Sequence, residues 1–293
     1  MIVVKLMGGL GNQLFQYATG RALALKHNTE LKLDLSLLNA DPKNVYTKRE
    51  LELHVFNIIA SIASNNELEM FYKRTFFQKV VTKLFPSFPS KYFIGNQKGF
   101  EYDEAFESYP NNSYLNGYWQ SEKYFSSIRE ILLKELVIKK EMTPLCKSTK
   151  DLILNSNSVS LHIRRGDYVS DKSASVYHGS VPLDYYDKAM THLNGSFKDV
   201  KVFIFSDDMD WVKANLKLTN ECVYVDFNTG ENSVFDMYLM SQCKHNIIAN
   251  SSFSWWGAWL NQNPQKTVIA PEKWFADKNL NTKDLIPNSW LKM

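Results

Sequence analysis

The chain has 293 residues, a length that suits one large or two moderate domains, and 44% of them are hydrophobic, as in an ordinary globular protein. Its 12 glycines and 9 prolines exclude a collagen-like or low-complexity chain. The formal net charge of +3 is too small to indicate a nucleic-acid partner, and we expect none.

Cysteine usage and the start of the chain indicate the compartment. Cys146, Cys222 and Cys243 lie far apart and form neither a disulfide framework nor a zinc-ligand spacing. Residues 1–7 are apolar but end at Gly8 and lack a basic start, so they do not resemble a signal peptide. No run of about eighteen apolar residues occurs. We therefore expect a cytoplasmic protein.

Residues 2–7 are predicted to form a buried strand, which ends at the glycine-rich segment 8–13, Gly-Gly-Leu-Gly-Asn-Gln. Apolar residues then recur at helical spacing over 12–26, and residues 31–35 alternate as in a second strand. This order predicts the start of an α/β domain. Leu14 stands where a dinucleotide-binding fingerprint requires its third glycine, so a nicotinamide-dependent oxidoreductase is disfavoured.

Residues 40–155 carry no regular pattern, but part of this stretch has an unusual composition. Residues 70–93 hold eight aromatic side chains and five lysines and arginines, and no acid. One interpretation is an irregular helix whose basic face lies in water. The other is a surface for peripheral contact with the inner membrane or with a lipid-linked acceptor. The sequence leaves both open.

From residue 158 onward the pattern becomes regular. The predicted strands cover 159–163, 201–205, 222–226, 246–249 and 267–270, and the predicted helices cover 182–194, 209–217, 233–243 and 253–262. Strands that alternate with helices predict a parallel, doubly wound sheet. We therefore expect two Rossmann-like domains, over residues 1–150 and 151–293.

The segment 160–168, Ser-Leu-His-Ile-Arg-Arg-Gly-Asp-Tyr, places polar side chains at the end of a predicted strand. Alternation along the strand puts His162 and Arg164 on one face, at the carboxyl end where open α/β sheets bind ligands. Arg164 presents a planar set of donors that matches phosphate oxygens. Arg165 and Asp167 could form a supporting ion pair. A purely structural cluster, in which both arginines satisfy Asp167 and nearby carbonyls, is the alternative.

The segment 250–259, Asn-Ser-Ser-Phe-Ser-Trp-Trp-Gly-Ala-Trp, follows a predicted strand and begins a helix. Ser251, Ser252 and Ser254 supply hydroxyls beside the unpaired N–H groups of a helix N-terminus, where the helix dipole favours an anion such as a diphosphate. An ordinary helix cap by Ser251 or Ser252 would have the same sequence. The helical spacing of the three tryptophans indicates core packing rather than a platform for sugars.

Two acidic features each allow two roles. Asp207, Asp208 and Asp210 follow a predicted strand, where they could hold a divalent cation, but Asp207 or Asp208 could instead cap the next helix. Asp236 is either a solvated helix residue or an acceptor for the N–H edge of a base. No histidine is paired by spacing with a serine or cysteine nucleophile, so no hydrolase triad is indicated.

Three motifs in this order resemble those of bacterial α-1,2-fucosyltransferases of glycosyltransferase family 11. They are Gly-Gly-Leu-Gly-Asn-Gln-Leu-Phe-Gln-Tyr at 8–17, His-Ile-Arg-Arg-Gly-Asp-Tyr at 162–168 and Asn-Ser-Ser-Phe-Ser-Trp-Trp at 250–256. Residues 40–115 carry little of the resemblance. It implies a GT-B-type α/β fold of two facing Rossmann-like domains, the first on the acceptor side and the second binding a GDP-sugar, with the active site in the cleft between them.

The resemblance also implies an activity. L-Fucose would move from GDP-fucose to O2 of a terminal galactose with inversion and without a metal or other cofactor, in the synthesis of a glycan or an O-antigen-type polysaccharide. The acceptor would be a lactose-like or lipid-linked galactoside. A transferase for another GDP-sugar and a non-catalytic glycan-binding module are the alternatives.

Roles for individual residues follow from the resemblance. Arg164 matches the arginine that binds the donor β-phosphate, and Ser252 matches a serine of the phosphate loop. Asp236 matches the aspartate that binds guanine, and His162 matches a histidine beside the nucleotide. The implied donor-binding residues are Gly9, Gly11, His162, Arg164, Asp236, Ser251, Ser252 and Ser254.

The N-terminal turn is implied to face the phosphate and the reacting centre, through Gly9, Gly11 and Asn12. Arg164 and Asn12 are therefore the predicted catalytic residues. Arg164 would stabilise the negative charge that forms on the β-phosphate as GDP departs, much as a metal ion does elsewhere.

The general base is left unassigned. An inverting displacement is helped by a group that takes the proton of the acceptor hydroxyl. Gln13 could orient that hydroxyl but cannot accept its proton. Asp34, His178 and Asp184 are candidates for the base, and the sequence does not choose among them.

Overall fold

In the computed structural model the chain forms two compact units. The residues that the structure describes are 1–40, 49–72, 92–165, 179–277 and 279–293. The first unit comprises Met1–Lys139 and Lys283–Leu285, and the second comprises Lys140–Thr282 and Ile286–Met293. The chain thus changes unit earlier than the predicted boundary at residue 150, because α5 (Pro144–Leu154) packs on elements of the second unit.

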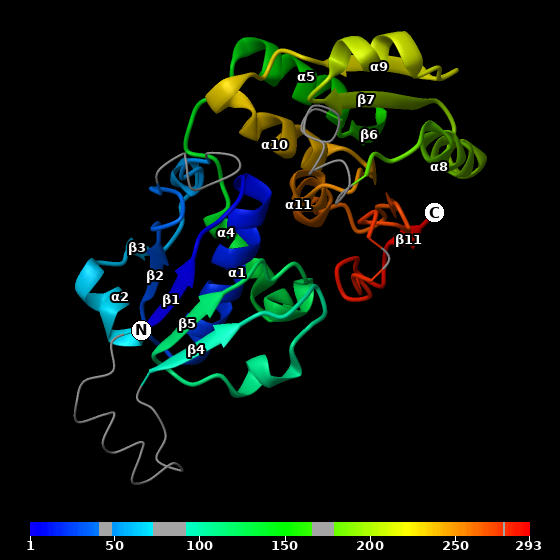
Figure 1. Ribbon diagram of the computed structural model, residues 1–293. Helices are drawn as coiled ribbons and strands as arrows, with labels where there is room; N and C mark the ends of the chain where they lie inside the picture. Colours follow the sequence, from blue (N-terminus) through cyan, green and yellow to red (C-terminus); the bar gives the residue numbers. More distant parts are fainter. Residues whose placement is uncertain (41–48, 73–91, 166–178, 278) are drawn as a thin grey trace, which may run out of the picture. The chain divides into compact units, whose positions relative to one another are not determined.

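The first unit is built on a five-stranded parallel sheet (Figure 1). In spatial order its strands are β3 (Ser61–Ile62), β2 (Leu31–Asp34), β1 (Ile2–Lys5), β5 (Ser113–Asn116) and β4 (Phe93–Asn96). From β1 the chain runs outward to β3 on one side, crosses to β4 at the opposite edge and then moves inward to β5. β1 is therefore the central strand of this sheet, with β2 and β5 as its neighbours.

The described part of the first unit also contains helices and short turns of 3₁₀ helix. They are α1 (Leu10–Lys26), α2 (Asn65–Tyr72), α4 (Arg129–Glu135), η2 (Leu53–Val55), η3 (Glu104–Ser108), η4 (Glu122–Tyr124) and η5 (Ser126–Ile128). α1 is buried on most of its surface, and two of its polar side chains pair with Glu135. Tyr17 donates to Glu135, which also forms an ion pair with Arg21 at 2.8 Å. Of residues 70–93, positions 73–91 lie outside the described residues, so the membrane-contact interpretation stays a prediction.

The second unit contains a six-stranded parallel sheet, as the alternation of strands and helices predicts. In spatial order its strands are β11 (Leu291–Lys292), β10 (Val268–Ala270), β9 (His245–Ile247), β6 (Asn157–Ile163), β7 (Val200–Ser206) and β8 (Glu221–Val225). The chain moves from β6 outward to β8 and then returns to β9. The strand order reverses between β6 and β9.

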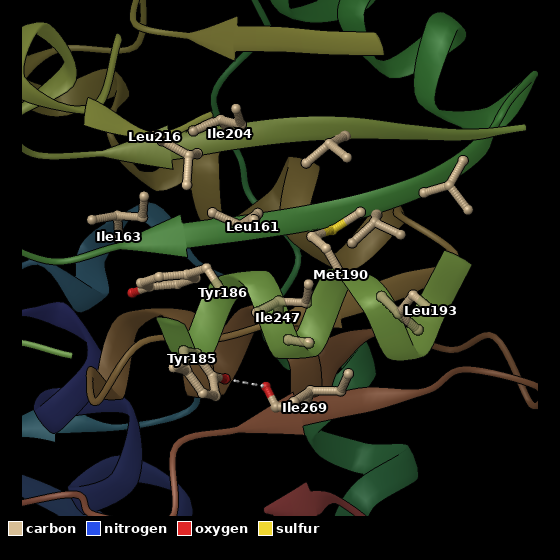
Figure 2. Close-up of a cluster of buried hydrophobic side chains, with 14 of the residues drawn as sticks. Leu161, Ile163, Tyr185, Tyr186, Met190, Leu193, Ile204, Leu216, Ile247 and Ile269 are labelled. Atoms are coloured by element: carbon tan, nitrogen blue, oxygen red, sulfur yellow. Dashed lines mark hydrogen bonds between the residues drawn. The ribbon is translucent and has the colours of Figure 1, made fainter. Parts of the chain in front are cut away.

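One face of this sheet packs against α8 (Leu183–Ser196), as Figure 2 shows, and against α9 (Met209–Asn215). Leu161 and Ile163 of β6 lie on this face together with Tyr186 and Met190 of α8. The predicted alternation along β6 is therefore confirmed. The Tyr185 hydroxyl donates to the carbonyl oxygen of Ile269 at 3.0 Å, which ties α8 to β10.

Within its described residues, the second unit also contains η6 (Gly230–Asn232), α10 (Val234–Gln242) and α11 (Ser252–Leu260). α10 and α11 pack on each other. Trp255, Trp256 and Trp259 of α11 are at most 3% exposed and contact one another, so they belong to the core, as their spacing indicates. None of the helices within the described residues combines the length and the apolar character that crossing a bilayer requires.

Candidate functional site

Three predicted segments meet at one edge of the second sheet. β6 pairs in parallel with both β7 and β9, so the residues that follow these three strands lie at the same edge. Arg164 follows β6, Asp207 follows β7, and Ser251 follows β9. The carboxyl ends of strands at a reversal of strand order are where open α/β sheets bind ligands. The fold therefore gathers residues from distant parts of the chain at a favoured binding position.

Arg164 forms an ion pair at this edge. Its Nη1 lies 2.9 Å from Oδ2 of Asp207, and the two side chains are 27% and 23% exposed. The other oxygen of Asp207 accepts the backbone N–H of Arg165 at 2.9 Å. A guanidinium carries five N–H donors, so this contact orients Arg164 without using all of its hydrogen-bonding capacity. Asp207 thus fixes both the side chain and the backbone where the chain leaves β6.

Arg165 has a supporting role at the same edge. Its guanidinium stacks 3.5 Å above the Trp211 ring, and its Nε lies 3.4 Å from Oδ2 of Asp208. The predicted partner Asp167 lies outside the described residues. Asp208 also caps α9 by accepting the N–H of Trp211 at 3.3 Å, so the interpretation of this segment as a helix cap is confirmed for Asp208. In the part of the chain that the structure describes, no group of three or more His, Cys, Asp or Glu is arranged to hold a metal ion.

His162 lies buried beside this ion pair. It is 5% exposed, and its ring centroid is 6.2 Å from that of Phe253 on α11. Burial lowers the pKa of His162 to about 4, with Asp207 raising it and Arg164 lowering it, so the ring is neutral at neutral pH. Nδ1 has no hydrogen-bond partner among the described residues. Because buried polar atoms are nearly always paired in native proteins, a bound ligand is a natural partner for this nitrogen.

The N-terminus of α11 contributes backbone N–H groups. Ser251 is the N-cap, and its Oγ accepts the N–H of Phe253 at 3.3 Å, which confirms the interpretation of this serine as a cap. Ser254 is 1% exposed, whereas Ser252 is partly exposed. Asn250 donates to the carbonyl oxygens of Gly179 and Trp274 and so holds the chain that enters the helix. The first turn of a helix favours anions because its N–H groups point out of the helix toward a ligand and the helix dipole places partial positive charge there.

Asp236 lies in the first turn of α10. It is partly buried rather than solvated, and burial raises its pKa to about 7. Its Oδ1 accepts a hydrogen bond from Nδ2 of Asn228 at 2.8 Å. Asn228 is 7% exposed, and its own Oδ1 has no partner within the described residues. The pair presents acceptors suited to a ligand that carries several N–H donors.

In the first unit, the turn between β1 and α1 lies at the carboxyl end of the central strand. Gly8 has φ +75, and a Cβ there would stand 2.5 Å from Nδ2 of Asn12, so only glycine fits without strain. Gly9 is the N-cap of α1, and Gly11 is buried within its first turn. The half-buried Asn12 accepts a hydrogen bond from Nε2 of Gln120 at 2.7 Å, which links the segments that follow β1 and β5.

Two predicted acceptor-side residues have internal partners instead. Gln13 is fully buried; its Nε2 donates to the carbonyls of Gly8 and Glu50, and its Oε1 accepts the N–H of Glu52. Asp34 is 2% exposed and accepts the N–H of Ser36 and the hydroxyl of Tyr114. These partners favour structural roles for both side chains, because neither presents a polar group to a ligand.

The two remaining candidates for the general base receive no support from the structure. Asp184 is exposed on α8 and forms an ion pair with Lys188, one turn away, at 3.0 Å. His178 lies outside the described residues.

Two buried amides at these edges were missed by the sequence analysis. Asn228 follows β8, a strand that the sequence predicts, so its position just beyond that strand could have identified it as a candidate binding residue. Gln120 follows β5, which lies in the stretch without a regular pattern, so no signal was available.

Comparison with known proteins identifies the family. A family model described as Glycosyl transferase family 11 matches residues 1–293. An alpha-1,2-colitosyltransferase of Escherichia coli is 38% identical to this chain, and the matched region covers 100% of this chain and 99% of that protein. The O-antigen biosynthesis glycosyltransferase WbnK of Escherichia coli is 35% identical, with 98% of this chain and 99% of that protein covered.

A solved structure is similar in fold. The selenomethionine form of fucosyltransferase NodZ from Bradyrhizobium matches with a TM-score of 0.50 and 14% identity, over 87% of this chain and 90% of that chain. At this identity the likeness concerns the fold alone. Together with the two parallel sheets, it confirms the predicted GT-B-type α/β fold. The match over the whole chain means that this protein is a glycosyltransferase and belongs to glycosyl transferase family 11.

Proposed function

We propose that this glycosyltransferase moves L-fucose from GDP-fucose to O2 of a terminal galactose, with inversion at the sugar C1, in the synthesis of an O-antigen-type polysaccharide. The two relatives in Escherichia coli support an α-1,2 linkage and a role in O-antigen synthesis. The resemblance of the three motifs to α-1,2-fucosyltransferases supports fucose as the sugar. The acceptor is a lactose-like or lipid-linked galactoside.

The observation that carries the proposal is the set of N–H donors gathered at one edge of the second sheet. Arg164, oriented by Asp207, stands beside the N-terminus of α11 at the reversal of strand order. Both the guanidinium and the N–H groups of Ser252 and Ser254 in the first turn favour a diphosphate. As GDP departs, negative charge grows on its β-phosphate, and groups already in position stabilise that charge without reorganising. These groups fulfil the charge-stabilising role for which a metal ion is used elsewhere.

The nucleoside part of the donor meets acceptors of matching chemistry. Guanine presents adjacent N–H donors, and Asp236 together with the amide oxygen of Asn228 supplies acceptors for them. The unpaired Nδ1 of the neutral His162 serves as a further contact beside the phosphates. The second unit therefore binds GDP and releases it.

The first unit supplies the acceptor side of the reaction. Gly9 and Gly11 carry no side chain that would obstruct a ligand at the turn, and the Asn12 amide, held by Gln120, orients the galactose hydroxyl. Contact of residues 70–93 with a membrane that carries a lipid-linked acceptor remains a prediction. Co-sedimentation with anionic vesicles tests it.

A second candidate donor is favoured by one observation. The relative at 38% identity is an alpha-1,2-colitosyltransferase, and colitose is fucose without its 3-hydroxyl. The same diphosphate and guanine contacts suit a GDP-linked form of either sugar. The two sugars differ only in the 3-hydroxyl, which fucose has and colitose lacks. A protein group that pairs with this hydroxyl would favour GDP-fucose.

The test is release of GDP with lactose as acceptor and EDTA present. GDP-fucose, GDP-colitose, GDP-mannose and UDP-galactose are compared, and the product linkage and anomer are assigned by NMR. We expect acceptor-dependent release from GDP-fucose that survives EDTA and yields an α-1,2 product. A preference for GDP-colitose would replace the named sugar, and loss of activity with EDTA would return Asp207 and Asp208 to a role in metal binding. If no donor gives release of its nucleotide with any acceptor of a wider glycan panel, a non-catalytic glycan-binding module is favoured.

A further inference from the structure

Glu52 is a partly buried carboxylate that the contacts assigned above do not use. It precedes η2 in the first unit, yet it lies against the glycine-rich turn at the start of α1. Its Oε1 is 3.7 Å from the position that a Cβ on Gly9 would occupy. The carboxylate also accepts the backbone N–H of Leu10, the first residue of α1. The missing side chain of Gly9 thus leaves Glu52 beside the turn that carries Asn12.

The backbone that carries Glu52 is fixed by Gln13. The Oε1 of Gln13 accepts the N–H of Glu52 at 2.9 Å, and its Nε2 donates to the carbonyl oxygen of Glu50 at 2.8 Å. Gln13 is fully buried, so its amide cannot move without breaking both contacts. A carboxylate on a backbone held in this way is preorganised, as a catalytic group needs to be.

The surroundings of Glu52 make it a stronger base than an ordinary carboxylate. Burial raises its pKa, and the charge of Glu50 acts in the same direction. Arg49, the Leu10 N–H and His54 oppose this shift but do not cancel it. A carboxylate whose pKa is closer to neutral takes a proton from a hydroxyl more readily in a transition state.

We infer that Glu52 is the general base of the transfer reaction proposed above. As the galactose 2-hydroxyl oxygen bonds to C1 of fucose, its proton passes to the Glu52 carboxylate. The bond from C1 to the β-phosphate oxygen breaks, and its electron pair leaves with GDP. The inference rests on the proposed function and fills the role for which Asp34, with both oxygens engaged inside the unit, is poorly suited.

A purely structural role for Glu52, as a cap for the N–H of Leu10, is the competing explanation. The variant Glu52→Gln separates the two roles, because a glutamine of the same length still accepts this N–H but cannot take a proton. Glu50→Gln is the matched control. It removes the same charge from an exposed side chain two positions away and leaves the Glu50 carbonyl that Gln13 contacts.

The experiment measures kcat and KM for GDP-fucose and lactose from pH 5 to pH 9, with thermal midpoints for each variant. We expect Glu52→Gln to lower kcat on the order of 10²-fold or more, with KM for GDP-fucose and the thermal midpoint unchanged. The fall in wild-type rate at low pH should disappear in this variant. Glu52→Asp should restore part of the turnover. Glu50→Gln should keep most of the wild-type turnover, with the fall in rate moved to lower pH, because the charge that helps to raise the pKa of Glu52 is gone.

Two results would overturn the assignment. One is an active Glu52→Gln variant that keeps more than about half of the wild-type kcat, since a base contributes far more than twofold. The other is a loss of turnover in Glu52→Gln that is accompanied by a lower thermal midpoint, which is the signature of a cap. A wild-type protein that transfers no sugar would instead refute the proposed function itself.

Discussion

Arg164 contributes both charge and geometry. Its contact with Asp207 orients the guanidinium before a ligand arrives. A lysine would keep the charge but lose the planar set of donors that matches phosphate oxygens. We expect Arg164→Lys to lower kcat by about a hundredfold or more, about 3 kcal/mol in the transition state, with an unchanged thermal midpoint. GDP release and thermal unfolding measure the two effects, and near-wild-type turnover would remove Arg164 from the mechanism.

Asp236 predicts a pH dependence of GDP binding. Burial raises its pKa to about 7, and the N–H edge of guanine pairs with the ionised carboxylate. Below this pKa the protein must lose a proton to bind GDP, so affinity falls as the pH falls. We expect the Kd for GDP to be about tenfold higher at pH 6 than at pH 8 by proton linkage. Calorimetric titration measures it, and Asp236→Asn, which has no such proton, should bind weakly at both pH values. A Kd independent of pH in the wild type would contradict the guanine contact.

Periodicity explains which individual residues could be placed from the sequence. Alternation along one strand was enough to put His162 and Arg164 on one face, because a strand has a fixed period of two. Periodicity cannot show that Gln13 and Asp34 turn inward, because their partners come from Glu50, Glu52 and Tyr114, which are distant in sequence. The residue type alone does not show whether an amide or a carboxylate in a motif faces a ligand or pairs with a neighbouring backbone group.

The turn between β1 and α1 is a structural element with little tolerance for change. Gly8 combines φ +75 with a neighbour, Asn12, that a Cβ would strike. We expect Gly8→Ala to destabilise the first unit by more than about 1 kcal/mol and to reduce kcat, because relieving the clash displaces Asn12 from Gln120. Gly99→Ala, where an added Cβ meets nothing within 4 Å, is the control. Denaturant unfolding and turnover are measured together, and an unaffected Gly8→Ala would show that the turn can adapt.

Elements with a strong period were predicted, and the others were not. The predicted strand at 159–163 became β6, whose buried positions alternate between two covered faces. Residues 40–155 gave no such pattern, because their strands are short and mixed in polarity. β3 has two exposed residues, and β5 buries Ser113, whose hydroxyl is paired with the carbonyl of Pro110. Such strands are defined by their neighbours in the sheet rather than by their own residues.

At the scale of the molecule, the chain builds the same kind of sheet twice. Each sheet is parallel, and in each a motif directly follows an interior strand, β1 in the first unit and β6 in the second. Open α/β sheets bind ligands at the carboxyl ends of their strands, so each unit offers one candidate binding edge. The proposed function assigns the acceptor to the edge in the first unit and GDP to the edge in the second. The resemblance to α-1,2-fucosyltransferases implies this division of roles, and it stays a prediction.

The return of the chain to the first unit near its C-terminus leads to a prediction for the whole molecule. The Asp284 side chain is 8% exposed, pairs with Lys123 and accepts the backbone N–H of Tyr102 at 2.9 Å. Asp284→Ala would leave that N–H without its partner, at a cost of about 1–3 kcal/mol. Because all three residues belong to the first unit, the loss should fall on that unit alone.

Hydrogen exchange read by mass spectrometry tests this prediction peptide by peptide. In Asp284→Ala we expect faster exchange around Tyr102 and Lys123 and unchanged exchange in β6 and β7. Asp277→Ala is the control, because the Asp277 side chain is exposed and accepts hydrogen bonds from the nearby Asn279 in the second unit. Faster exchange in both units would mean that they unfold together, since a contact inside one unit would then stabilise the other. Faster exchange confined to the first unit would show that the last residues of the chain stabilise the unit in which the chain begins.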